Sequence, residues 1–148
     1  MARAPGLVEI ACLPEPLDGE RLREITRAFD ENPLLMAKTD TSGGTLVTAD
    51  EVRGGLFFRV YVDGGPVGFY VLYLHQADGR TEAVITLAYG RAAFDFCTVA
   101  LPLVEAQCAG CAGLAMLTKR RGLVRKLAGA GYAITDSRNG VTHMRKAL

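Results

Sequence analysis

A basic run near residue 120 holds the side chains of this sequence best suited to binding an anion. Its five members are Lys119, Arg120, Arg121, Arg125 and Lys126. Guanidinium and ammonium groups can hold a phosphate, a nucleic-acid backbone or an acidic protein surface. Cations near the start of a helix oppose its dipole, which suggests that these charges have a use. A solvated basic face is the commoner meaning of such a run, and without alternating aromatic residues we do not expect it to bind nucleic acid.

The cysteines and histidines favour no metal site. Cys108-Ala109-Gly110-Cys111 has the spacing of a redox or zinc motif, but zinc needs four ligands and the sequence has no second such pair. His75 and His143 are isolated in sequence. Helical periodicity instead favours Cys108 and Cys111 as small buried apolar residues. A cysteine nucleophile with a histidine base remains an alternative, because such partners need only meet in space.

Composition predicts one ordinary globular domain over residues 1–148. The chain is 49% hydrophobic and 22% charged, which is enough apolar material for a real core. The net charge of +1 gives no overall attraction to nucleic acid or to an anionic membrane. Four cysteines in such a domain are expected to be reduced thiols. Because the start lacks the apolar stretch of a signal peptide and no run approaches about 18 apolar residues, we expect a soluble, cytoplasmic protein.

Three strands joined by short turns form the centre of the expected fold. They are rich in β-branched and aromatic residues and span residues 56–62, 66–74 and 81–89. Glycines in the connecting segments supply the positive φ of tight hairpin turns, as in Asp63-Gly64-Gly65. The elements expected before this meander are a strand over 7–13, a helix from Asp18 to Asn32-Pro33, an apolar segment over 34–38 and a short helix after the capping box Thr48 to Glu51.

A strand, helix and second strand follow and predict a parallel pair. The helix is expected from about Asp95 to Cys111, and Pro102 either bends it or marks its true start. After the strand Leu114 to Thr118, a last helix and a hairpin around Asn139-Gly140 complete the chain. The fold class is α/β (α+β), with a mixed, mainly antiparallel sheet of about seven strands flanked by helices. The aromatic residues of the first hairpin fall on both sheet faces, so one set is expected in the core and the other in a cleft or interface; they are Phe57, Phe58, Tyr61, Tyr70 and Tyr73.

This order of elements, with Val67-Gly68-Phe69 in the hairpin and Gly131-Tyr132 after the last helix, resembles the GNAT acyltransferase fold. The resemblance covers nearly the whole chain as architecture and only a few residues as motif. It implies acetyl-CoA as cofactor, held after the fourth strand by a loop of pattern Gln/Arg-x-x-Gly-x-Gly/Ala. Free N–H groups and the positive end of a helix dipole attract the pyrophosphate there. In size and pattern the chain is also similar to small GNAT-like proteins of tailed bacteriophages.

Two features depart from the family pattern. At the loop the chain reads Arg91-Ala92-Ala93-Phe94-Asp95-Phe96, so Arg91 fits while two phenyl rings replace small residues and Asp95 adds a negative charge. Counting back from Gly131, Leu127 stands where many members keep the tyrosine that protonates the thiolate, and Arg120 replaces a common asparagine. Leucine cannot donate a proton. Glu82, at the start of the fourth strand, is the remaining candidate for a catalytic base, unless its charge only solvates the strand end.

Two functions are compatible with this pattern. The first is a non-catalytic binding or assembly protein, virion-associated if phage-encoded, which contacts a protein partner or its own copies through Lys119 to Lys126 and the outward aromatic rings. The second is a divergent acetyl-CoA-dependent N-acetyltransferase that holds the coenzyme phosphates through Arg91, Arg120 and Arg121. The failure of two independent family features slightly favours the first.

Overall fold

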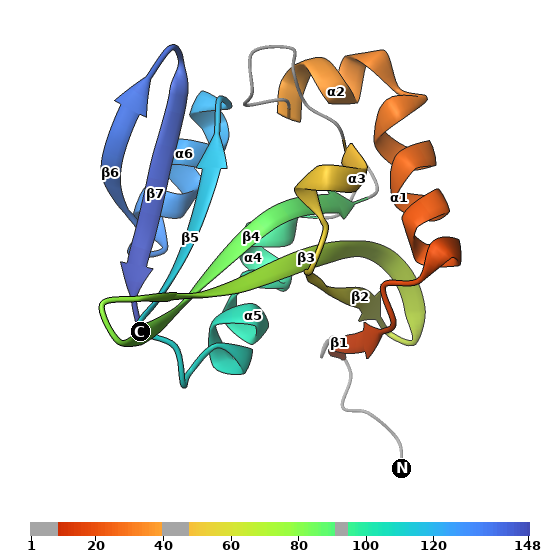
Figure 1. The fold of residues 1–148 in the computed structure, drawn as a ribbon, viewed down its shortest axis with the longest axis horizontal. Coiled ribbons are helices and arrows are strands. Elements are labelled where there is room, and N and C mark those ends of the chain that lie inside the picture. Colours follow the sequence, from red (N-terminus) through yellow and green to blue (C-terminus); the bar gives the residue numbers. More distant parts are fainter. Residues whose placement is uncertain (1–8, 40–47, 91–94) are drawn as a thin grey trace.

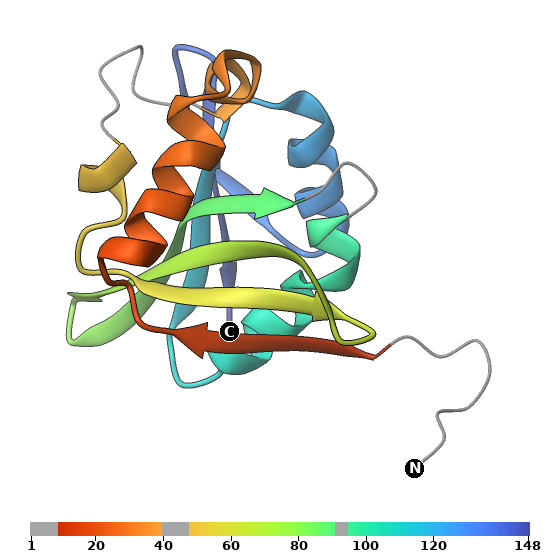
Figure 2. The same cartoon turned by 90° about the vertical axis from the view of Figure 1, so that its right-hand side faces the viewer.

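A mixed β-sheet with helices on both faces makes up the fold (Figure 1, Figure 2). The computed structural model describes residues 9–39, 48–90 and 95–148, and within these ranges the sheet has seven strands in the order β1-β2-β3-β4-β5-β7-β6. The strands are β1 Ile10–Glu15, β2 Leu56–Val62, β3 Gly65–Ala77, β4 Arg80–Gly90, β5 Gly113–Thr118, β6 Ala133–Arg138 and β7 Val141–Ala147. The helices are α1 Gly19–Asp30, α2 Pro33–Thr39, α3 Thr48–Glu51, α4 Phe96–Val99, α5 Leu101–Gln107 and α6 Arg121–Gly129. Neighbouring strands are antiparallel except β4 and β5, which are parallel, so the predicted mixed sheet is confirmed.

Three two-residue turns connect the antiparallel hairpins. Both central residues of each turn have positive φ, which is 52° and 80° at Asp63-Gly64, 53° and 76° at Asp78-Gly79, and 53° and 78° at Asn139-Gly140. This backbone twist matches the right-handed twist of the paired strands, and it explains why aspartate or asparagine precedes glycine in all three. The hairpins expected from these residues are therefore confirmed.

Two hydrophobic cores cover the two faces of the sheet. On the face that we call the α1 face, Ile25 and Phe29 of α1 pack against Phe57, Phe69 and neighbouring residues of β2 to β4. On the opposite face, called the α5 face, side chains of α5 and α6 pack against β2 to β5 and β7. Both cores bury aromatic rings of the first hairpin, so the idea that one set lies at an interface is wrong for those rings.

Phe57 and Tyr70, for example, are buried on opposite faces, with exposed fractions of 1% and 0%. Phe58 stacks on Tyr70 with ring centroids 5.2 Å apart. Tyr73 is the member of the set that stays exposed, at 41%. It lies towards the end of β3, beyond the residues that α1 covers.

The helix expected from Asp95 to Cys111 is instead two helices. α4 ends at Val99 and α5 runs from Leu101 to Gln107. Pro102 lies in the first turn of α5, where a missing N–H costs no helical hydrogen bond. Of the two predicted alternatives, a bend or a helix start, Pro102 therefore marks a helix start. Cys108 ends α5 and is buried in the core, as predicted, whereas Cys111 is only partly buried and packs against that core.

Two N-terminal elements also differ from expectation. The first strand begins at Ile10 among the described residues and extends through Pro14, which it tolerates because β1 is an edge strand. The apolar segment over 34–38 is part of helix α2. Asn32 caps this helix by accepting a hydrogen bond from the backbone N–H of Leu35 at 3.1 Å, so the Asn-Pro pair was the missed signal.

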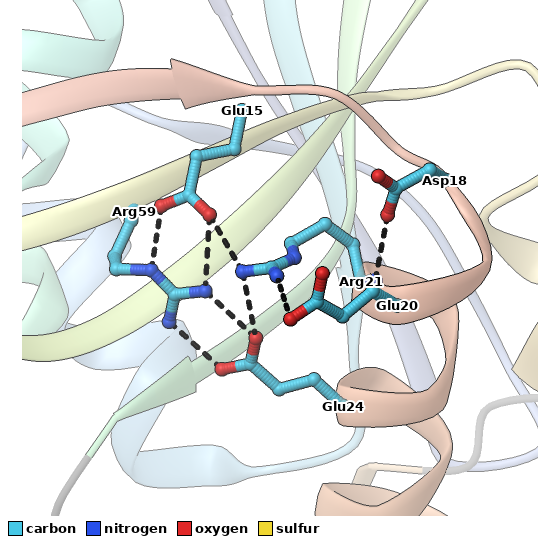
Figure 3. Close-up of polar contacts among 6 residues, drawn as sticks. All are labelled: Glu15, Asp18, Glu20, Arg21, Glu24 and Arg59. Carbon is cyan, nitrogen blue, oxygen red and sulfur yellow. Dashed lines mark hydrogen bonds and ion pairs between the residues drawn. The ribbon is translucent and has the colours of Figure 1, made fainter.

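An ion-pair network fastens α1 to the N-terminal edge of the sheet (Figure 3). Arg59 of β2 donates from Nε to Glu15 Oε2 at 2.6 Å and from Nη2 to Glu24 Oε1 at 2.7 Å. Arg21 of α1 donates from Nη1 to Glu15 Oε1 at 2.8 Å. The hydrogen bonds from Arg59 hold the pKa of Glu24 below its usual value. Three elements, β1, β2 and α1, are thus joined by one charged cluster.

Candidate functional site

Strands β4 and β5 separate towards their C-terminal ends. Their register pairs begin at Glu82↔Gly113 and end at Ile85↔Met116, although β4 continues to Gly90 and β5 to Thr118. In Figure 1 the arrowheads of the two strands point apart. We call the separation between residues 86–90 of β4 and residues 117–118 of β5 the splay.

A β-bulge lies where the splay begins. In the pairing of β3 with β4, Val71 is opposite Leu87 and Leu72 is opposite Ile85, so Thr86 has no register partner. A bulge bends its strand and increases the local twist. It therefore turns the last part of β4 away from β5. Beyond Ile85, no described residue of β5 pairs with β4, so this edge of β4 is left for another hydrogen-bonding partner.

The basic residues gather in the turn that follows β5. Arg120 precedes α6 as its N-cap residue, and its backbone N–H donates to Thr118 Oγ1 at 3.1 Å. The start of α6 has no side-chain cap and no acidic residue in its first turn. Among the described residues, none forms an ion pair with the four exposed cations Lys119, Arg120, Arg121 and Arg125. We call these four the basic turn; their charge lies uncompensated beside the splay.

Lys126, the fifth basic residue of the run, differs from the others because it has a partner. Its Nζ lies 3.0 Å from Oδ2 of Asp95, which precedes α4. Lys126 and the cap hydrogen bonds to Thr98 hold the pKa of Asp95 below its usual value. The negative charge expected to disfavour a diphosphate is therefore neutralised in part, and the ion pair joins the segment after β4 to the helix after β5. Residues 91–94, with the predicted phosphate ligand Arg91, lie outside the described residues.

Leu127 stands at the position where the resemblance implied a proton-donating tyrosine. Leu127 is fully buried in the core of the α5 face, with an exposed fraction of 0%. The neighbouring Tyr132 donates its hydroxyl to Glu105 Oε2 at 2.9 Å, and burial together with this carboxylate raises its pKa. Leu127 therefore has a packing role in the α5-face core.

Glu82 lies at the paired end of β4, away from the splay. Arg145 of β7 donates to it twice, from Nη2 to Oε1 at 2.8 Å and from Nε to Oε2 at 3.3 Å. The guanidinium lies over Gly113, where a side chain of any other residue would collide with it at 2.4 Å. The contact between Arg145 and Glu82 connects β7 to β4 across β5. The role of Glu82 as a catalytic base stays a prediction.

His143, which is isolated in sequence, lies beside the splay. It belongs to β7, and its register partners are Leu117 in the neighbouring strand β5 and Asp136 in the neighbouring strand β6. Met144, the next residue, is buried in the α5-face core. Because side chains alternate along a strand, His143 lies on the opposite sheet face. His143 lies close to the end of β5 because β7 pairs with β5, and this pairing cannot be read from the sequence.

Metal-ligand and membrane-spanning features are also absent from the described ranges. Within 9–39, 48–90 and 95–148, no three His, Cys, Asp or Glu side chains are grouped as they would be around a metal ion. None of the helices in those ranges has the length and apolar character needed to cross a bilayer.

The solved structures to which this fold is similar include several acetyltransferases. The chain is similar to an aminoglycoside N(6')acetyltransferase from Legionella pneumophila, with a TM-score of 0.69, 8% identity and coverage of 92% of this chain and 91% of that chain. It is similar to an acetyltransferase from Thermus thermophilus, with a TM-score of 0.67, 15% identity and coverage of 94% and 97%. A GNAT family acetyltransferase from Elizabethkingia anophelis with acetyl-CoA bound matches with a TM-score of 0.60, 14% identity and coverage of 94% and 98%.

By sequence alone, no protein-family model and no curated protein matches the chain. At these identities the structural likeness establishes the fold. The chain therefore has the GNAT fold, as its order of elements indicated, and a coenzyme-binding function has to be argued from its own residues.

Proposed function

We propose that this protein binds an acyl-coenzyme A in the splay and transfers the acyl group to an amine, as a divergent N-acyltransferase. The observation that carries the proposal is the combination of an open β4 edge with an unpaired basic turn beside it. A pantetheine chain has amide groups that can pair with a strand edge, and coenzyme A has phosphates that can bind guanidinium groups. Structural neighbours with bound acetyl-CoA or CoA support this choice of ligand.

Two parts of the chain bind different parts of the coenzyme. The edge of β4 over residues 86–90 offers backbone hydrogen bonds to an extended ligand. Arg120 and Arg121, with Lys119 and Arg125, offer charge to its phosphates, as the sequence led us to expect. When bound, the coenzyme supplies the activated acyl group as a thioester. Because Leu127 supplies no proton, the sulfur leaving group takes its proton from the amine through water.

Calorimetric titration with acetyl-CoA tests this function. We expect saturable binding by the wild-type protein, and at least a tenfold loss of affinity in Arg120→Glu/Arg121→Glu, because two charge-assisted contacts become repulsive. The matched control is Arg23→Glu/Arg80→Glu, which makes the same change in net charge at two exposed positions on α1 and at the start of β4. Equal affinities of both double variants would contradict a coenzyme site at the basic turn.

A second function is favoured by Leu127 and by the ion-paired state of Glu82. In it the protein is a non-catalytic binding or assembly protein, virion-associated if phage-encoded, and the basic turn with Lys126 contacts an acidic partner surface. This function predicts no acetyl-CoA binding in the titration above. It also predicts a defined oligomer or complex in light scattering, and Arg120→Glu/Arg121→Glu would dissociate it.

A further inference from the structure

His143 lies on the sheet face opposite the α5-face core. Met144, the next residue, is 1% exposed within the α5-face core, so the side chain of His143 lies on the opposite face of β7. Arg145, the residue after Met144, lies on the same face as His143. It is half-buried and donates a hydrogen bond to Glu82. In Figure 1, α6 lies behind β5 and β7, while α1 to α3 lie beside this part of the sheet.

The splay is one strand away from His143. Its register partner Leu117 is the first residue of β5 beyond the last β4–β5 pair, and it is 41% exposed. Side chains of directly paired residues have Cβ atoms about 4.5–5.5 Å apart. A half-buried imidazole at this position therefore lies next to the strand end where the β4–β5 pairing has stopped.

The imidazole has no competing engagement within the described residues, where no hydrogen bond or ion pair to its ring occurs. Asp136, opposite it on β6, is paired with Arg138 at 3.1 Å. Arg145, two residues along the same face, is paired with Glu82 at 2.8 Å. Lys119 follows β5 and adds an unpaired positive charge nearby. Of the charged side chains around the ring, Asp136 and Arg145 are thus neutralised by their own ion-pair partners among the described residues, and Lys119 is not.

We infer that His143 is the general base that deprotonates the acceptor amine, an inference that rests on the acyltransferase function proposed above. An ammonium acceptor gives one proton to the imidazole, and the resulting amine nitrogen attacks the thioester carbonyl carbon. The C–N bond forms and the C–S bond breaks. The second proton of the nitrogen passes through water to the sulfur, and the imidazolium returns its proton to solvent. Atoms and charge balance, and no further reactant is needed.

Bromoacetyl-CoA, an alkylating analogue of the acyl donor, tests the position of His143. If the ring borders the acyl group, its nitrogen bonds to the CH2 carbon while bromide leaves and the ring proton passes to water. We expect mass spectrometry of the digested protein to find the adduct on His143, and excess CoA to prevent it. His75, the other histidine of the chain, lies near the far end of β3 and should stay unmodified. An adduct elsewhere, or none despite bound coenzyme, would overturn the inference.

Acetyl transfer from acetyl-CoA to the amines of poly-L-lysine tests the chemical role. We expect His143→Gln to lower the rate about 100-fold, the lower end of general-base contributions, and to change the pH profile of the rate. Acetyl-CoA affinity should stay unchanged, and His75→Gln should behave as wild type. A His143→Gln rate with the wild-type pH profile, or no transfer at all by a protein that binds acetyl-CoA, would refute the base role. A wild-type protein that does not bind acetyl-CoA would refute the proposed function itself.

Discussion

The residue Leu127 has a packing role, because its side chain is fully buried in the α5-face core. We predict that Leu127→Ala lowers the free energy of unfolding by about 2–5 kcal/mol, the usual cost of truncating a buried leucine. Urea denaturation measures this change. A loss below about 1 kcal/mol would mean that the position is not part of the core.

Glu82 offers a second test at the scale of single residues. Its carboxylate is held by Arg145 and lies at the paired end of β4, so its observed contacts are structural. We predict that Glu82→Gln lowers the free energy of unfolding by about 1 kcal/mol, because one charge-assisted contact between half-buried groups is lost. Acetyl transfer to poly-L-lysine should remain within a factor of a few of wild type. Loss of transfer with unchanged stability would instead identify Glu82 as the catalytic base.

At the scale of elements, the Arg59 cluster, made of Glu15, Arg21, Glu24 and Arg59, joins β1, β2 and α1. Arg59 is 44 residues from Glu15 and 35 residues from Glu24 in the sequence. We predict that Arg59→Met costs about 2 kcal/mol at neutral pH, because Glu15 and Glu24 lose their shared partner. Arg53→Met is the control, since the Arg53–Asp50 pair is exposed and should contribute less than about 0.5 kcal/mol.

The same cluster predicts an acid dependence of stability. Arg59 lowers the pKa of Glu24 in the folded state, so the associated stability is present above the unfolded pKa of Glu24 and is lost as the pH falls through the lower folded pKa. Denaturation curves from neutral pH to pH about 3 should therefore show a smaller loss for Arg59→Met than for the wild type. Parallel curves for the two proteins would contradict this origin.

Local residue patterns were sufficient for most elements, and they failed where the cause was not local. The Asp-Gly and Asn-Gly turns fix two residues of backbone each, so the hairpins could be placed from the sequence. The break between α4 and α5 does not follow from the sequence, because Pro102 is compatible with a kink or with a helix start until packing selects one. Asn32-Pro33 carried a cap signal that would have revealed α2.

The candidate site depended more on tertiary contacts. The basic turn was evident from its charges, but only strand order shows that it borders the splay and that Lys126 is paired with Asp95. Glu82 and Arg145 are far apart in sequence, so their pairing could not be foreseen. The position of His143 could not be predicted for the same reason, since its neighbour Leu117 is reached only through the β5–β7 pairing.

At the scale of the whole molecule, β4 and β5 are the single parallel pair of the described sheet and its centre. On one side of this pair, the strands β2, β3 and β4 follow one another through tight turns, and on the other side β6 and β7 do the same. The coenzyme site that we propose would therefore lie at the junction of two halves, each made largely of contacts between neighbouring segments of chain. A ligand in the splay would touch both halves.

The shortness of that junction has a kinetic consequence. The four register pairs from Glu82↔Gly113 to Ile85↔Met116 join strands separated by two helices, whereas the hairpins close over two residues. Closing a longer loop costs more entropy, so we expect the hairpins to form early and the β4–β5 pairing to form after the folding transition state. Contacts that form late govern the unfolding rate rather than the folding rate. The lifetime of the folded chain thus depends on the short segment of strand next to its candidate site.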